Sequence, residues 1–367
     1  MKSLYIHIPF CSKKCLFCSF AISVGAAHRV EEYLDALETE LINYDKVEIS
    51  TIYFGGGTPN FIHSNQIARI MKNIKDNFQV SDNASWSMEV NPEKIDAQHA
   101  RQLSILGFNR VSLGMQTFND VYLKFLGRTH DRATGVRAYA HLRDAGFKDI
   151  NIDLMYGFPG QTRAELAQDL NEVITLYPQH VSIYTLTIEP NSRFYVKAVK
   201  LDSDDKLADD YVFVSQSLEA QGLKQYEVSN FAQEGFMSRH NLSYWQGGDY
   251  IGVGMGAHGL DQGRRYWNED TLSKYIDAIK LKGNAVHGEE KLSSLTRLTE
   301  DLIFGLRMNA GVSVEQLEQR AGVTLKAEQS KELASLIKEG FLEKDKGFIR
   351  STIKGRLVLD EIAVRLI

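Results

Sequence analysis

The stretch H-I-P-F-C-S-K-K-C-L-F-C-S-F, residues 7–20, is the most informative part of this sequence. It contains all three cysteines of the 367-residue chain, Cys11, Cys15 and Cys18, in the spacing C-x-x-x-C-x-x-C. Three thiolates on one short loop suit a soft metal centre, whereas pairing them as disulfides would leave one thiol over. The spacing therefore predicts a metal site.

Two kinds of metal centre fit this loop. A [4Fe–4S] cube usually takes one thiolate per iron, so three cysteines leave one iron open for another ligand. A structural zinc completed by His7 is the alternative, although zinc ligands usually come as two separated pairs. Inert core cysteines are a third interpretation, which Lys13 and Lys14 disfavour because they place the loop near solvent. The cluster is the favoured hypothesis.

The composition is typical of a soluble globular protein, with 43% hydrophobic and 24% charged residues. A net charge of -5 does not favour a nucleic-acid partner. The N-terminal residues do not resemble a signal peptide, and the apolar segment 15–27 is shorter than the roughly 18 residues that span a bilayer. We expect a cytoplasmic protein without a transmembrane segment, in which thiols stay reduced.

Up to about residue 186, short apolar runs alternate with stretches of helical periodicity, such as 30–44 and 66–78. The predicted strands are 4–8, 51–54, 85–90, 110–115, 149–155 and 180–186. Six strand–helix repeats predict an α/β fold with a parallel sheet and helices outside it. In such folds the reactive groups follow the carboxyl ends of the strands.

Candidate binding groups do follow these strands. Gly55-Gly56-Gly57-Thr58-Pro59 would let the backbone approach a ligand closely, with a tight packing turn as the alternative. Glu89, near the end of the third strand, could bind ribose hydroxyls if it points inward, and would otherwise be a surface acid. Three further candidates remain. Gln116 carries an amide, Arg128 could pair with a carboxylate, and Asp153 is an acid on a predicted strand.

The cysteine spacing, with aromatic Phe17 before the last cysteine, resembles the signature of the radical S-adenosylmethionine (SAM) superfamily. Residues 5–10, YIHIPF, are similar to the oxygen-independent coproporphyrinogen III dehydrogenases and their haem-chaperone relatives, the HemN/HemW family. The resemblance implies an incomplete (β/α)6 TIM-like barrel and a [4Fe–4S] cluster bound by the three cysteines. It also implies that SAM chelates the open iron and that an electron from the reduced cluster cleaves it to a 5'-deoxyadenosyl radical. The cofactor-binding positions that it implies are Tyr5, Phe17, Gly56, Gly57, Thr58, Glu89, Gln116, Arg128 and Asp153.

The second half predicts a helix over 202–221, a strand over 226–232 and a glycine-rich loop over 252–259. Between the last two lies His240 in the segment HNLSYW, residues 240–245. An imidazole beside Tyr244 and Trp245 could ligate haem iron while the aromatic rings pack on the porphyrin. A hydrogen-bonded histidine in a domain joint is the alternative, and the similarity to the HNxxYW segment of the haem-chaperone branch favours the haem ligand.

From about residue 292 the sequence predicts short charged helices and a hairpin, a small winged-helix-like α+β domain. Residues 313–367 contain ten Lys or Arg and nine Asp or Glu, which is too balanced for a DNA-reading module and favours a lid or docking surface. The expected domains are a barrel over 1–190, an α/β extension carrying HNLSYW over 191–290, and the C-terminal domain over 291–367.

Two features favour the haem-chaperone branch. Coproporphyrinogen dehydrogenases typically carry a further cysteine two residues after the third, where this chain has Phe20, and an extension ahead of the cluster motif, where only four residues precede Tyr5. The hypothesis is a protein that binds a [4Fe–4S] cluster, SAM and haem and passes haem to an acceptor apoprotein. Oxidative decarboxylation of coproporphyrinogen III is the enzymatic alternative, and a zinc-stabilised binding module is a third. A reductant such as flavodoxin or ferredoxin is expected, and a homodimer is compatible with the sequence.

Overall fold

The computed structural model describes residues 1–44 and 46–367. Its centre is a 12-stranded sheet in the order β14-β13-β12-β11-β1-β4-β5-β6-β7-β8-β10-β9. Six neighbouring strands run parallel: β1 (Lys2–Ile8), β4 (Val47–Gly56), β5 (Phe78–Val90), β6 (Arg110–Gln116), β7 (Asp149–Tyr156) and β8 (His180–Thr185). They are the six predicted strands in chain order, so the predicted parallel sheet is confirmed.

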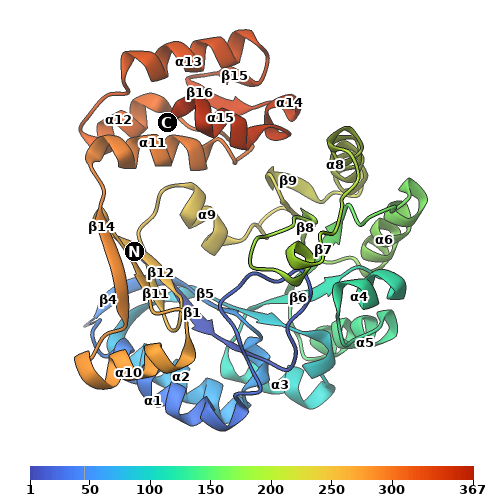
Figure 1. The fold of residues 1–367 in the computed structure, drawn as a ribbon, viewed down its shortest axis with the longest axis vertical. Helices are drawn as coiled ribbons and strands as arrows, with labels where there is room; N and C mark the ends of the chain where they lie inside the picture. Colours follow the sequence, from blue (N-terminus) through green and yellow to red (C-terminus); the bar gives the residue numbers. More distant parts are fainter. Residues whose placement is uncertain (45) are drawn as a thin grey trace.

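Helices cover the outer face of these strands (Figure 1): α1 (Val30–Leu41), α2 (Ser64–Asn77), α3 (Ala97–Leu106), α4 (Asp120–Leu126), α5 (Arg132–Asp144) and α6 (Arg163–Leu176). Thr162 and Glu165 form a capping box at the start of α6. Shorter elements lie near the sheet's carboxyl edge: β2 (Phe10–Cys11), β3 (Ser23–Val24), η1 (Ala27–Arg29), η2 (Pro59–Phe61) and η3 (Pro92–Lys94). The pairing of β2 with β3 closes the cysteine segment into a loop.

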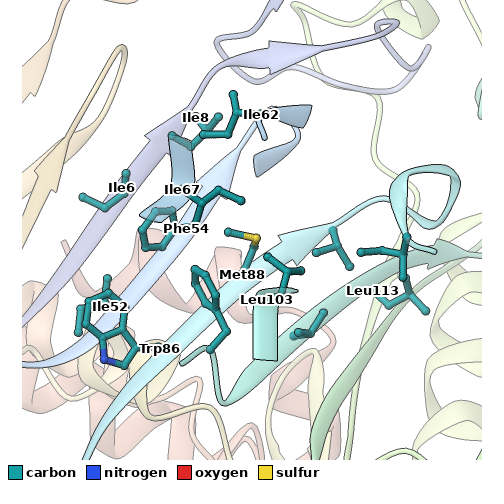
Figure 2. Packing of buried hydrophobic residues seen from close by; sticks show 14 of the residues in the cluster. Ile6, Ile8, Ile52, Phe54, Ile62, Ile67, Trp86, Met88, Leu103 and Leu113 are labelled. Atoms are coloured by element: carbon teal, nitrogen blue, oxygen red, sulfur yellow. The ribbon is translucent and has the colours of Figure 1, made fainter. Parts of the chain in front are cut away.

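The main hydrophobic core lies between the parallel strands and their helices. Figure 2 shows Ile6 of β1, Phe54 of β4 and Met88 of β5 pointing toward Ile67 of α2 and Leu103 of α3. All five side chains are fully buried, and burial of each stabilises the fold by about 1.5–3 kcal/mol. This packing fixes the carboxyl ends of the strands, from which the site is built.

Both edges of the sheet differ from the sequence prediction. The glycine-rich stretch 252–259 is not one loop, because its ends belong to β11 (Tyr250–Val253), parallel to β1, and to β12 (His258–Asp261). The antiparallel strands β13 (Arg264–Asn268) and β14 (Val286–Lys291) continue this edge. At the other edge, the single strand predicted over 226–232 is a hairpin of β9 (Lys224–Glu227) and β10 (Asn230–Ala232).

Within the described residues the edge strands β14 and β9 do not pair, so the sheet stays open as an incomplete barrel. The helices of the middle segment are α7 (Arg193–Val196), α8 (Asp204–Glu219), α9 (Arg239–Trp245) and α10 (Leu272–Lys282). In Figure 1, α9 lies between the sheet and the C-terminal helices.

The C-terminal residues form a compact unit with its own hydrophobic core. It contains α11 (Ser294–Gly305), α12 (Val314–Ala321), α13 (Ala327–Lys338), the hairpin of β15 (Leu342–Asp345) and β16 (Phe348–Ser351), α14 (Ile353–Arg356) and α15 (Leu359–Leu366). Helices followed by a hairpin agree with the winged-helix-like prediction. In the part of the chain that the structure describes, no helix has the length and apolarity needed to cross a bilayer.

Candidate functional site

The cysteine loop lies beside the carboxyl ends of the parallel strands. Cys11 Sγ is 3.3 Å from the Thr58 hydroxyl, and Arg128 Nη1 approaches Cys15 Sγ at 3.5 Å. Burial raises the pKa of the Cys11 thiol to about 11 and also raises the pKa of Cys18. Thiolates at these positions therefore require a positive partner, as metal ions would provide.

The arrangement distinguishes between the two metal hypotheses. In residues 1–44 and 46–367, no three His, Cys, Asp or Glu side chains converge on one point as a single ion requires. A cubane does not need such convergence, because each thiolate binds a different iron. His7 is buried, with Nε2 2.8 Å from the Ala21 carbonyl oxygen and Nδ1 3.1 Å from the Tyr5 hydroxyl. The geometry therefore does not support a zinc ion completed by His7.

The glycine segment at the end of β4 packs directly against the cysteine segment. Gly57 N donates to the Ile8 carbonyl at 2.8 Å, and a Cβ on Gly57 would lie 2.7 Å from the Pro9 carbonyl. Gly56 has φ +110°, and a Cβ there would lie 2.6 Å from the His7 ring. Only glycine permits this approach, which leaves the backbone of the segment on the wall of a cavity.

Two carboxylates enter the same cavity from neighbouring parts of the sheet. Glu89 accepts hydrogen bonds from the Tyr53 hydroxyl at 3.0 Å and from Gly56 N at 3.3 Å. Burial, assisted by the nearby charge of Asp153, raises the pKa of Glu89 to about 7. Asp153 accepts from Ser112 at 2.7 Å, and burial raises its pKa as well. Glu89 therefore points inward and is not a surface acid.

Arg128 crosses the cavity to the segment that follows β5. Its Nη2 donates to Asn91 Oδ1 at 2.7 Å and to the Gly114 carbonyl at 3.1 Å. Asn91 in turn donates to the Thr58 hydroxyl at 3.0 Å. Arg128 Nε is buried and has no hydrogen-bond partner in the described part of the chain, so the guanidinium keeps a donor for a ligand.

The cavity has a volume of about 460 Å³. It is lined by eleven of the thirteen predicted site residues: Cys11, Phe17, Cys15, Cys18, Gly56, Gly57, Thr58, Glu89, Gln116, Arg128 and Asp153. Gln116 adopts φ +70° beside a register shift in the strand pairing, a strained conformation that costs about 1 kcal/mol and that is common at functional sites. The predicted residues Tyr5 and His240 are absent from the lining.

His240 lies behind this cavity, on α9. Its Nδ1 is 2.8 Å from the Thr51 hydroxyl and its Nε2 is 2.8 Å from the Tyr244 hydroxyl, while the ring stacks on Tyr53 with centroids 4.9 Å apart. Burial lowers the pKa of His240 to about 3, so the ring is neutral. Neither nitrogen is open to a metal here, and the arrangement matches the alternative of a hydrogen-bonded histidine at a joint. Tyr5 lies nearby, with its ring stacked on Tyr53 at 6.3 Å.

Comparisons with known proteins agree with this geometry. The model of the family described as "Radical SAM superfamily" matches residues 5–173 of this chain, and the model of the family described as "HemN C-terminal domain" matches residues 292–358. The chain is 35% identical to the heme chaperone HemW of Bacillus subtilis (strain 168), over 99% of this chain and 98% of the relative. The chain belongs to the HemW branch of the radical SAM HemN family. It is also 34% identical to the heme chaperone HemW of Lactococcus lactis (strain IL1403), over 96% of this chain and 94% of that one.

The HemN/HemW fold is also found among solved structures. Coproporphyrinogen III oxidase (HemN) from Escherichia coli superposes with a TM-score of 0.88 at 30% identity, covering 99% of this chain and 89% of that one. The radical SAM family implies a [4Fe–4S] cluster and SAM. The residues present fit both groups, because three cysteines, a glycine wall that a Cβ would fill and an unpartnered Arg128 donor meet in one cavity.

Several polar residues of this cavity are not among the residues predicted from the sequence. Asn91 connects Arg128 to Thr58, and its position in the segment Glu89–Pro92 was a usable signal. Ser112 and Asn151 both donate to Asp153 at 2.7 Å. Asn151 lies two residues before Asp153, hence on the same face of β7, which alternation along a strand would have revealed.

Proposed function

We propose that this chain is a haem chaperone that carries a [4Fe–4S] cluster and SAM, binds haem and delivers it to an acceptor protein. One observation supports this most directly, the 35% identity to a heme chaperone over 99% of the chain. Phe20 supports the same choice, because coproporphyrinogen dehydrogenases typically carry a cysteine at this position.

The proposed roles follow from the cavity. Cys11, Cys15 and Cys18 bind the cluster, and the backbone of residues 56–58 contacts the methionyl part of SAM. Glu89 accepts hydrogen bonds from the ribose hydroxyls, and its ionised carboxylate offers both oxygens as acceptors. The guanidinium of Arg128 and the amides beside it orient the amino-acid end of SAM. When bound, a reduced cluster with SAM supplies one-electron chemistry.

A second function has support from a different observation, the similarity to HemN at a TM-score of 0.88. That protein is a coproporphyrinogen III oxidase, and an inward polar surface built from Ser112, Asn151 and Asp153 could accommodate a polar substrate. The two functions predict opposite outcomes in one assay.

Anaerobically reconstituted protein is incubated with SAM, a reductant such as flavodoxin or ferredoxin, and coproporphyrinogen III, and a parallel sample is titrated with haem. A stable haem complex without protoporphyrinogen formation supports the chaperone, and transfer of that haem to an acceptor apoprotein completes the test. Appreciable turnover would select the enzyme instead. The proposal includes a cytoplasmic location, where thiols stay reduced, and a homodimer that size-exclusion chromatography would detect.

A further inference from the structure

A second cavity, of about 980 Å³, lies at the edge of the sheet formed by the added strands. Its lining comes from the cysteine loop, from α9, α10 and α11, and from β11, β12, β13 and β14, and it is rich in aromatic side chains: Phe20, Tyr244, Trp245, Tyr250, Trp267 and Phe304. Phe20 and Ser19 also line the first cavity, so the cysteine loop separates the two.

This cavity contains an imidazole without a partner. His258, at the start of β12, is exposed, and within the described residues no group hydrogen-bonds to its ring. Its ring lies nearly parallel to that of Trp267, with centroids 6.2 Å apart and an interplanar angle of 26°. Partial burial and the charge of Arg265 lower the pKa of His258, which favours the neutral ring that binds metals.

Most ring nitrogens of the other histidines in this region already have hydrogen-bond partners. Both ring nitrogens of His7 and of His240 have hydrogen-bond partners. His287 Nδ1 is 3.1 Å from a carboxylate oxygen of Glu269. Within the described residues His287 Nε2 is also free, but His258 is the histidine of this cavity whose ring has no hydrogen bond and stacks on the aromatic wall, at Trp267.

The backbone before His258 is fixed in advance of any ligand. Gly254 N donates to Glu40 at 2.9 Å, and Asn268 N donates to the Ala257 carbonyl at 2.9 Å. Glu40 also accepts from Asn268 Nδ2 at 2.6 Å and from the Tyr275 hydroxyl at 2.7 Å. A ligand at His258 would thus meet a preorganised position, which lowers the entropic cost of binding.

The charges and exposed rings define the ligand chemistry. Phe20 is 64% exposed and Phe304 is 39% exposed, and both line the same hollow as the other aromatic rings, so their apolar surfaces are gathered at one place. In the lining, Glu300 is paired with Arg265, and Asp301 is paired with Arg297 and Arg320. Lys274 and Asp270 have no ion pair with any described residue, so the lining offers one free ammonium group beside one free carboxylate. An apolar, flat ligand that carries carboxylates fits this combination of aromatic walls and an unpaired ammonium group.

We propose that haem binds in this second cavity with His258 as its axial ligand, an inference that rests on the proposed chaperone function. Trp267 and Phe20 contact the porphyrin, and Lys274 pairs with a propionate.

The test titrates haem into anaerobically purified, cluster-containing full-length protein, as wild type and as the variants H258A, H240A and H28A. His28 is an exposed histidine outside both cavities and serves as the matched control. We expect H258A to bind haem at least about tenfold more weakly and to lose the imidazole-ligated Soret and EPR signatures. Free imidazole should restore those signatures in H258A, which a merely structural role would not produce. H28A should match the wild type.

Failure of this site and failure of the function are distinguishable. If the wild type binds no haem, the chaperone function fails. If the wild type binds haem and folded H258A binds it equally well, or if only H240A loses the imidazole signature, the site assignment is overturned. If H258A does not fold, the same comparison of haem binding is made between the wild type and H258Q, whose side chain suits the strand.

Discussion

Replacing Glu89 with glutamine tests the electrostatics of the first cavity. Burial and Asp153 raise the pKa of Glu89 from 4.5 to about 7 in the folded protein. The folded protein therefore binds a proton between these pH values that the unfolded chain does not bind. The stability supplied by the neutral carboxyl is complete below pH 4.5 and is lost as the pH rises through 7.

The size of the effect follows from the two pKa values. At about 1.36 kcal/mol per pKa unit, the shift corresponds to about 3 kcal/mol, of which about 2 kcal/mol is lost between about pH 5.5 and 8. Glutamine does not titrate, so E89Q does not lose this stability. As the pH rises through that interval, the free energy of unfolding of SAM-free E89Q should increase by about 2 kcal/mol relative to that of the wild type. For a 367-residue chain that unfolds as one unit, this gain in stability is a rise in thermal midpoint of about 3 °C relative to the wild type.

The assay is thermal unfolding of cluster-containing, SAM-free protein under anaerobic conditions at several pH values. SAM binding to E89Q should weaken at pH 8 even as stability rises, because the amide has lost an acceptor oxygen. E40Q is the matched control, since burial also raises the pKa of Glu40 to about 7, yet Glu40 does not line the first cavity. If the thermal midpoints of the wild type and E89Q differ by the same amount at every pH, the reasoning is refuted.

Three further outcomes are expected. C15A should lose the brown cluster chromophore in anaerobic purification, and full retention of iron would contradict its assignment as a ligand. G57A places a Cβ 2.7 Å from the Pro9 carbonyl, so unfolding should become easier by about 1–3 kcal/mol with weaker SAM binding, and an unchanged thermal midpoint would reject the packing argument. R128K keeps the charge but loses the guanidinium that donates to both Asn91 and the Gly114 carbonyl, so SAM affinity should fall about tenfold while cluster iron, measured in the same sample, stays constant. Equal SAM affinity in R128K would remove this residue from the site.

The close agreement between sequence and structure in the first cavity has a local cause. Each parallel strand is a short apolar run followed by its own functional group, as in Tyr53-Phe54 before Gly55–Gly57. Parallel strands bring their carboxyl ends to one edge, so residues as distant as Cys11 and Asp153 reach one cavity without any information beyond strand order.

By itself, the sequence determined the cysteine loop, the six parallel strands and most of the lining of the first cavity. Only the tertiary structure decided the partners of individual side chains and edge strands. His240 is hydrogen-bonded to Thr51, which lies 189 residues away in the chain, and β11 pairs with β1 across an even larger separation, as Ser3 does with Tyr250. Periodicity reports which face a residue is on but not which distant group it meets, so the second cavity and the unpartnered ring of His258 emerge only when the chain is folded.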